Sequence, residues 1–483
     1  MQPDNFNFGG GLTATTMHPL VVIAMIIAIL LTLVLPRKYL IVPFLVSAIL
    51  IPMSQTMVLG GVHFFVLRIV TVFGWIRMGA KKASSSESIF GNGLGALDIA
   101  FLCWAVFRTM AFLLRFSFQS VAVINQAGLL WDVIGAYFFL RFAIQDEDDI
   151  RRAIRTLAVI ACILTVCVLN EKFRAQNVFG YLGGMPVTPS MREGSVRPRG
   201  PFSHALLCGV FGATLPPLFV WLWSEGKSRV LAACGLMAST MITLVSASST
   251  PLMAYAAGGF ALCLWPIRKQ MRLVRWGIVF ALVGLQMAMK APVWFLIDHV
   301  DVIGASSGYH RAMLIDQFIR HFGEWWLAGT ANNANWGWDM WDLSNQFVAE
   351  GVSGGLAAFV LFIAIISISF RWIGNARKAA EGDRGKEWRI WALGAALFSH
   401  ILAFFGVSYW DHTQIYWFAL LAIIAAARVQ TVAEPIHTTE AAGADQQRHI
   451  VARVLAVRSR SAKPELLSRR SYSDVPLKPR RLS

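Results

Sequence analysis

Charge is what this sequence lacks most. Only 14% of its 483 residues are charged and 56% are hydrophobic, whereas roughly 25% of the residues of an average soluble domain carry a charge. Apolar stretches long enough for a helix to cross a hydrocarbon core of about 30 Å recur along most of the chain. The composition therefore excludes a single soluble domain and predicts an integral membrane protein.

Alternation of apolar and polar residues is also missing from these stretches, so they do not have the pattern of membrane-barrel strands. A backbone at lipid depth must satisfy its own hydrogen bonds, and a helix does so within one segment. We therefore predict an all-α fold, a polytopic bundle of about 12–13 transmembrane helices with a long extracytoplasmic loop before the third-last helix. The predicted spans are residues 17–35, 39–53, 62–78, 96–114, 127–144, 153–170, 203–223, 230–246, 251–267, 273–290, 347–370, 390–408 and 413–428.

Signatures of the common enzymes are absent as well. The chain has no Walker A, GxSxG, HExxH or dinucleotide-binding motif, so ATP use and the usual hydrolase chemistries lack support. All six cysteines fall inside apolar runs without a CxxC pair, which indicates inert packing residues. No cluster of Cys, His or carboxylate residues has the spacing of metal ligands. We therefore predict neither a metal nor another cofactor.

Positive charge exceeds negative charge, and the formal net charge is +16. The basic residues are spread over alternate short loops, which the positive-inside rule assigns to the cytoplasm. We therefore predict a lipid bilayer as a partner and no nucleic acid. The transmembrane domain should cover residues 1–429 with its N-terminus outside. A disordered basic tail, 430–483, should end in the cytoplasm.

Two long loops, about 171–202 and 291–346, fall on the opposite, outer side. The first breaks the charge rule with five basic residues, which are Lys172, Arg174, Arg192, Arg197 and Arg199. An arginine offers a planar fork of donors that matches two phosphate oxygens, so this charge predicts an anionic ligand outside the membrane. The alternative is that these arginines reach only to lipid headgroups.

Three motifs carry a resemblance to a known family. They are RPRGPFSHALLCG at 197–209, GYHRAMLIDQFIRHFGEWWLAGT at 308–330 and DLSNQFVAEGVSGGL at 342–356. In this order the motifs resemble the bacterial O-antigen ligase and polymerase superfamily, over roughly residues 150–410. The chain departs from the ligases in having no histidine just before Asn345, and Asp342 stands nearest to that place.

The resemblance implies a metal-independent glycosyltransferase of the bacterial inner membrane. It would transfer or polymerise a glycan from a polyprenyl-diphosphate donor onto an acceptor hydroxyl at the outer face, in surface polysaccharide synthesis. Fixed guanidinium groups would stabilise the charge that develops on the leaving diphosphate. The residues assigned to catalysis on this basis are Arg311, Asp342 and His310. Those assigned to substrate binding are Arg197, Arg199, His204, Asn345, Gln346, Glu350 and Arg108.

Alternatives remain for several of these features. His321 and the neighbouring Asp411 and His412 are further candidates for the general base. The Trp-rich and Asn-rich segment 325–341 either binds sugar or forms an aromatic belt at the headgroups. The whole protein could instead be a flippase for a lipid-linked oligosaccharide, or a non-catalytic protein of the same fold in envelope assembly.

Polar and small residues inside the predicted spans also need an explanation, because charge at lipid depth is costly. Arg68, Arg108 and Asp132 form either an internal ion pair or part of a diphosphate pocket. A run of glycines at 351–355 predicts a small-residue face that packs closely against another helix.

Overall fold

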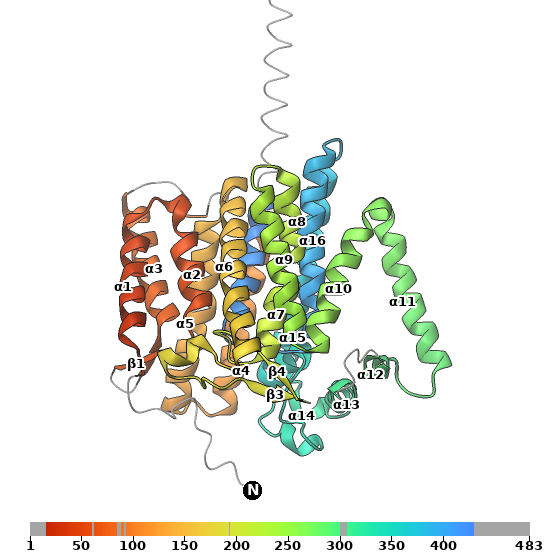
Figure 1. The fold of residues 1–483 in the computed structure, drawn as a ribbon. Coiled ribbons are helices and arrows are strands. Elements are labelled where there is room, and N and C mark those ends of the chain that lie inside the picture. The colour runs from red at the N-terminus through yellow and green to blue at the C-terminus, as the bar shows by residue number, and fades with distance from the viewer. Residues whose placement is uncertain are drawn as a thin grey trace, which may run out of the picture. The chain divides into compact units, whose positions relative to one another are not determined.

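The computed structural model describes residues 16–59, 62–84, 88–90, 93–192, 194–299 and 307–428. Within these residues the chain forms a helix bundle with two short hairpins, so the predicted all-α fold is confirmed (Figure 1). Among the residues that the structure describes, six helices are long and apolar enough to cross a membrane, which makes the chain a multi-pass membrane protein. They are α4 (Ala96–Arg115), α5 (Ser120–Ala143), α6 (Glu147–Arg174), α7 with α8 (Ala205–Glu225), η3 with α11 (Trp265–Ala288) and α15 (Gln346–Ala379).

Shorter elements fill the rest of the described chain. Three of them are apolar helices, α1 (Pro19–Val34), α9 (Arg229–Val245) and an unlabelled helix over Thr413–Arg428. The others are η1 (Arg37–Tyr39), α2 (Ile41–Leu50), α3 (Val66–Ser84), η2 (Val178–Leu182), α10 (Ser249–Cys263), η4 (Val293–Phe295), α12 (Leu296–His299), α13 (Ser307–Arg320), α14 (Phe322–Trp325), η5 (Asn333–Trp336) and α16 (Arg384–Phe404). The predicted count of about 12–13 spans stays a prediction. The predicted tail, 430–483, lies outside the described residues.

Charged residues at its two ends explain where α6 begins and stops. The Asp146 side chain accepts a hydrogen bond from the backbone N–H of Asp149, which caps the first turn. Acidic residues occupy that first turn and Lys172 and Arg174 the last, so both ends complement the helix dipole. Ala175 then adopts a left-handed conformation and ends the helix. The apolar middle of α6 packs against α9, as α4 packs against α15 and α10 against α16.

Two antiparallel hairpins interrupt the helical pattern. Strands β1 (Thr56–Leu59) and β2 (Val62–Phe65) pair with each other, and β2 occupies the segment predicted as the start of the third span. Strands β3 (Ser190–Arg192) and β4 (Ser195–Arg197) pair inside the first long loop, with Ser190 opposite Arg197. The second long loop is partly helical, since it contains α13 and α14. Figure 1 shows β3, β4, α13 and α14 at the same end of the bundle.

Charges between the helices pair with one another. The Arg68 guanidinium of α3 donates two hydrogen bonds to the Asp132 carboxylate of α5, at 2.8 and 2.5 Å. Its third nitrogen donates to the carbonyl oxygen of His63 at 2.7 Å. Arg68 and Asp132 therefore form the internal ion pair that was one of the two sequence-based alternatives.

Helix α15 is broken at Gly355, which has φ +69° and ψ −169°. The carbonyl oxygen of Val352 accepts hydrogen bonds from the Thr330 N–H and from the Arg115 guanidinium, both at 2.9 Å. The Leu356 N–H donates to the carbonyl oxygen of Trp326 at 2.7 Å. A loop from outside α15 therefore replaces the missing helical hydrogen bonds. The sequence analysis predicted close packing at these glycines but did not predict a break in the helix.

Gly355→Ala should destabilise the protein by at least about 1–3 kcal/mol, because this backbone conformation is open almost only to glycine. An added Cβ would also lie 2.7 Å from the carbonyl oxygen of Leu327. Gly374→Ala in the same helix is the matched control, since no atom lies within 4 Å of its added Cβ. Thermal unfolding of both variants in one detergent measures the difference, and equal midpoints would contradict the prediction.

Candidate functional site

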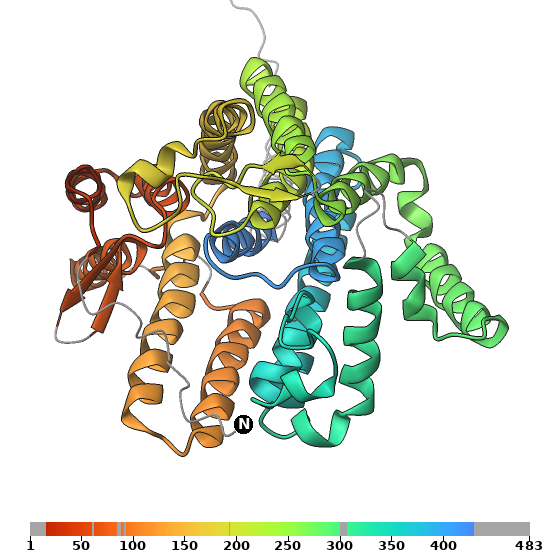
Figure 2. The ribbon, with the colours of Figure 1, turned by 60° about the horizontal axis from the view of Figure 1, so that its bottom comes forward.

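A cavity of about 840 Å³ lies at the end of the bundle that carries the β3–β4 hairpin and α13. Figure 2 turns this end of the bundle toward the viewer. The cavity is lined by the hairpin, the start of α7, the turn into α10, α13 between Tyr309 and Gln317, and part of the segment 336–344. Half of the predicted site residues line it, and these are Arg197, His204, His310, Arg311 and Asp342.

Positive charge dominates this cavity. The lining residues that are charged at neutral pH are Arg192, Arg197, Arg311, Asp339 and Asp342. Three guanidinium groups against two carboxylates favour an anionic ligand. Within the described residues, no three His, Cys, Asp or Glu side chains are grouped so that they could hold a metal ion.

Arg197 is fixed on one wall of the cavity. Lys172 of α6 supports its strand by donating hydrogen bonds to the Ser195 hydroxyl and the Val196 carbonyl oxygen, both at 2.8 Å. The Arg197 guanidinium itself donates to the Ser248 hydroxyl and, at 3.5 Å, to the carbonyl oxygen of Ser246. Since arginine has five N–H donors, others remain for a ligand.

Electrostatics around Arg197 also favour an anion. Burial, followed by the positive charge of Arg192, lowers the pKa of Arg197. A guanidinium nevertheless stays protonated at neutral pH. The two arginines are therefore neighbouring cations whose repulsion a bound anion would relieve.

Arg199 lies beside the cavity and does not line it. Its backbone N–H and that of Gly200 donate to the buried Glu171 carboxylate, at 3.2 and 2.9 Å. The Asn177 side chain donates to the Gly200 carbonyl oxygen at 2.8 Å, and Gly200 has φ +56°. This turn directs the Arg199 guanidinium to the Thr188 carbonyl oxygen, 3.2 Å away. The two arginines of the RPRG motif therefore have different surroundings.

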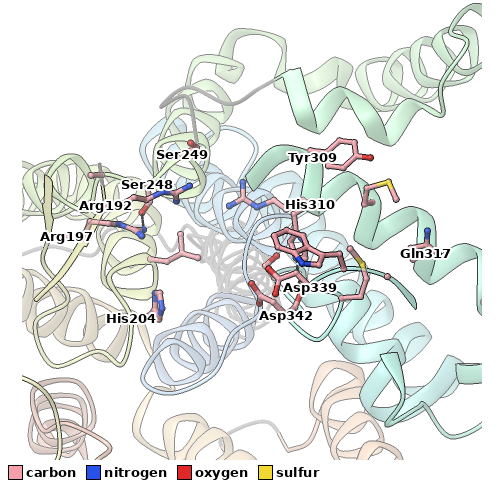
Figure 3. A pocket seen from close by; sticks show the side chains of 18 of the residues that line it. Arg192, Arg197, His204, Ser248, Ser249, Tyr309, His310, Gln317, Asp339 and Asp342 are labelled. Atoms are coloured by element: carbon pink, nitrogen blue, oxygen red, sulfur yellow. Dashed lines mark hydrogen bonds between the residues drawn. The ribbon is translucent and has the colours of Figure 1, made fainter. Parts of the chain in front are cut away.

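His204 occupies the N-cap position of α7, on the same wall as Arg192 and Arg197 in Figure 3. Its side chain makes no capping hydrogen bond. Enclosure by the protein, then the positive charges of Arg197 and Arg199, lowers the pKa of His204, which the Asp342 charge opposes. A ring with a lowered pKa is neutral at pH 7 and has a nitrogen that accepts a hydrogen bond.

The opposite wall carries His310, Asp339 and Asp342 (Figure 3). His310 and Arg311 come from the start of α13, and the Arg311 side chain is almost buried. The His310 Nε2 lies 3.2 Å from the carbonyl oxygen of Asp342, which ties α13 to the 336–344 segment. The Asp342 residue is exposed to the cavity.

The other assigned residues lie deeper, around the start of α15. Asn345 caps this helix by accepting a hydrogen bond from the Val348 N–H at 3.2 Å. The fully buried Glu350 carboxylate accepts from Trp104 at 2.8 Å and from Gln346 at 2.6 Å.

Arg108 lies next to this group, 3.9 Å from the Glu350 carboxylate. Arg108 and Gln346 line a separate space of about 10 Å³, room for one water molecule. The predicted substrate-binding residues Arg108, Asn345, Gln346 and Glu350 therefore do not line the large cavity.

The alternative bases have protein partners of their own. His321 bonds the Gln317 carbonyl oxygen at 2.9 Å and stacks on Trp336. His412 lies 2.8 Å from both the Asp411 carboxylate and the Ile51 carbonyl oxygen.

Asp411 in turn accepts hydrogen bonds from the backbone and hydroxyl of Ser203, at 2.8 and 2.5 Å. These contacts with Ser203 and His412 outweigh burial and lower the pKa of Asp411. The Asp411 and His412 pair thus anchors the start of α7 and does not line the cavity.

Several lining residues were not assigned from the sequence. Arg192 belongs to the same basic loop as Arg197, and this clustering of basic residues could have identified it from the sequence. Ser248, Tyr309 and Asp339 carry no pattern that points to a ligand, and only the fold brings them to the cavity.

Comparison with known proteins identifies no family. No protein-family model matches the chain, and no curated protein matches it significantly. The fold and the candidate spans define its class, which is a multi-pass helical membrane protein.

Proposed function

We propose that this protein is a glycosyltransferase that transfers or polymerises a glycan from a polyprenyl-diphosphate donor onto an acceptor hydroxyl. One observation carries the proposal. Arg197 and Arg311 belong to separate motifs and to distant parts of the chain, yet they line one cavity together with Arg192. The motifs resemble those of the O-antigen ligase and polymerase superfamily, in which such a donor is used.

The proposed reaction places negative charge where the arginines lie. The bond between the anomeric carbon and the diphosphate oxygen breaks, and the diphosphate leaves with the electron pair. A bond forms between that carbon and the acceptor oxygen, whose proton passes to a base. Fixed guanidinium groups favour this transition state because the leaving oxygen gains charge.

The size and lining of the cavity suit a glycan diphosphate. Sites for small molecules commonly measure about 300–1,000 Å³, and this cavity measures about 840 Å³. The Trp336 ring is buried in its wall, whereas Trp338 is 91% exposed and offers its ring to a sugar. These rings support the sugar-binding interpretation of the segment 325–341.

The location follows from the predicted topology. Basic loops alternate along the chain, and the positive-inside rule puts the cavity end of the bundle on the outer side. The proposal therefore puts the reaction at the outer face of a bacterial inner membrane, in surface polysaccharide synthesis. A cysteine at position 335 that reacts with an impermeant maleimide only in broken cells would contradict this orientation.

Purified protein in nanodiscs should bind farnesyl diphosphate, a short prenyl probe, more tightly than farnesyl monophosphate. Arg197→Ala and Arg311→Ala should each weaken diphosphate binding about tenfold or more, since each removes a charge-assisted contact. Arg320→Ala is the matched control, because Arg320 also lies on α13 but is exposed and paired with Asp316 at 2.6 Å. Isothermal titration measures the affinities.

Two outcomes would contradict the proposal. Equal affinity for the diphosphate and the monophosphate would remove the basis for a diphosphate site. Accumulation of lipid-linked glycan on the inner leaflet of Arg311→Ala cells would instead indicate a flippase. Accumulation on neither leaflet would indicate a non-catalytic scaffold.

A further inference from the structure

A base for the acceptor hydroxyl must have a nitrogen or oxygen that is open to the cavity. His310 also lines the cavity, but its Nε2 lies 3.2 Å from the Asp342 carbonyl oxygen, so one of its two ring nitrogens is already bonded. His321 and His412 are bonded to the protein and do not line the cavity. Among the described histidines, His204 is the one that lines the cavity with no hydrogen bond to its ring.

The backbone presents His204 to the cavity. The residue has an extended conformation, with φ −140° and ψ 144°, immediately before α7 begins at Ala205. The residue lines the cavity and keeps part of its surface exposed. Figure 3 shows its ring on one wall and His310 and Asp342 on the other, so an acceptor between the walls would face both.

The groups around His204 keep its ring neutral. Arg192 and Arg197 lie on its own wall and Arg199 in the same motif, while His310, Arg311 and Asp342 come from the opposite wall. Partial burial, followed by the positive charges of Arg197 and Arg199, outweighs the attraction of Asp342, so the pKa of His204 is lowered. A neutral imidazole is the form that can take up a proton.

We infer that the ring of His204 is the proton acceptor for the acceptor hydroxyl, an inference that rests on the proposed glycan transfer. As the acceptor oxygen bonds to the anomeric carbon, its proton moves to the imidazole. The diphosphate departs with the electron pair of the broken bond and is neutralised by Arg197 and Arg311. The imidazolium then loses its proton to the departed diphosphate or to water, which restores the neutral ring.

Right-side-out vesicles from host cells, which hold their own lipid-linked glycan, provide the test. Transfer is measured as the loss of acid-releasable lipid-linked glycan at a set external pH. His204→Gln should slow transfer by about 10²–10⁴-fold, the usual contribution of a general base. His63→Gln is the control, because His63 belongs to β2 and does not line the cavity. Binding of farnesyl diphosphate by purified His204→Gln protein should stay within a few fold of wild type.

The pH profile separates a proton acceptor from a positioning residue. Since the pKa of His204 is lowered from 6.5, wild-type transfer should persist below pH 6.5 and fall only as the ring becomes protonated at lower pH. This acid limb should disappear in His204→Gln. Added imidazole should restore transfer to His204→Gly, which a purely structural role would not allow.

The outcomes distinguish a failure of the proposed function from a failure of the assignment of His204. If wild-type vesicles transfer no glycan and the protein binds no prenyl diphosphate, the proposed function fails. If wild-type vesicles do transfer glycan, the assignment of His204 is overturned when His204→Gln keeps its rate while Asp342→Asn or His310→Gln loses it. A slow His204→Gln variant that keeps the acid limb, or a His204→Gly variant that imidazole does not rescue, overturns it as well.

Discussion

Arg311→Ala is expected to slow glycan transfer by about 10²–10³-fold, the usual cost of removing one donor to a developing oxyanion. Arg311 lines the cavity and is only 7% exposed, so its charge acts in a partly dry site. Screening by water is weak there, and the lost interaction is correspondingly large. The expected consequence in host cells is an excess of lipid-linked glycan and a lack of surface polysaccharide.

Mass spectrometry of the lipid-linked glycan, released by mild acid, measures this effect. Arg311→Lys should be intermediate, because lysine keeps the charge but loses the planar fork that meets two phosphate oxygens. Arg320→Ala on the same helix should leave transfer unchanged. An Arg311→Ala strain with normal surface polysaccharide would exclude Arg311 from the transition state.

The fold class was predictable because one physical constraint dominates. A bilayer accepts only segments whose backbone bonds are satisfied internally, so long apolar runs without alternation had to be helices. The break inside α15 could not be predicted from this constraint. At the break in α15 at Gly355, backbone groups of Thr330 and Trp326 form hydrogen bonds with α15. These residues are distant in the sequence from their partners, so no local sequence pattern predicts the contacts.

Charge singled out the loop of Arg197, whereas Arg311 was assigned only through the resemblance to a known family. Arg197 and Arg311 were assigned from motifs, and each lines the cavity. Arg199 was assigned with equal reason, but the Glu171 carboxylate holds the backbone at 199 and 200 in a turn that directs this side chain elsewhere. Sequence spacing indicates which residues are near a site, whereas the direction of each side chain depends on such buried contacts.

The residues around Glu350 show a second limit of predicting a site from sequence. Polar groups inside a membrane segment suggest function, because an unsatisfied charge there is costly. The structure supplies partners within the protein, since Trp104 and Gln346 both donate to the Glu350 carboxylate. The sequence could not distinguish a ligand contact from an internal one, because both need the same residue types.

The ion pair of Arg68 and Asp132 gives the second large expected effect. Asp132→Leu should destabilise the protein by about 3–5 kcal/mol, because it leaves the buried guanidinium without its anion. The side chains are only 10% and 16% exposed. The double variant Arg68→Met/Asp132→Leu should be more stable than Asp132→Leu, since it removes both charges together.

A double-mutant cycle on unfolding in a mixed-micelle denaturant measures this coupling. The exposed pair of Lys269 and Glu381, 2.8 Å apart with side chains 66% and 57% exposed, is the control. Its coupling should not exceed about 1 kcal/mol. If the double variant regains stability but no longer binds farnesyl diphosphate, the pair also belongs to the diphosphate site. If it regains both, the two charges serve only to join α3 to α5, and the candidate phosphate ligands are the arginines that line the cavity.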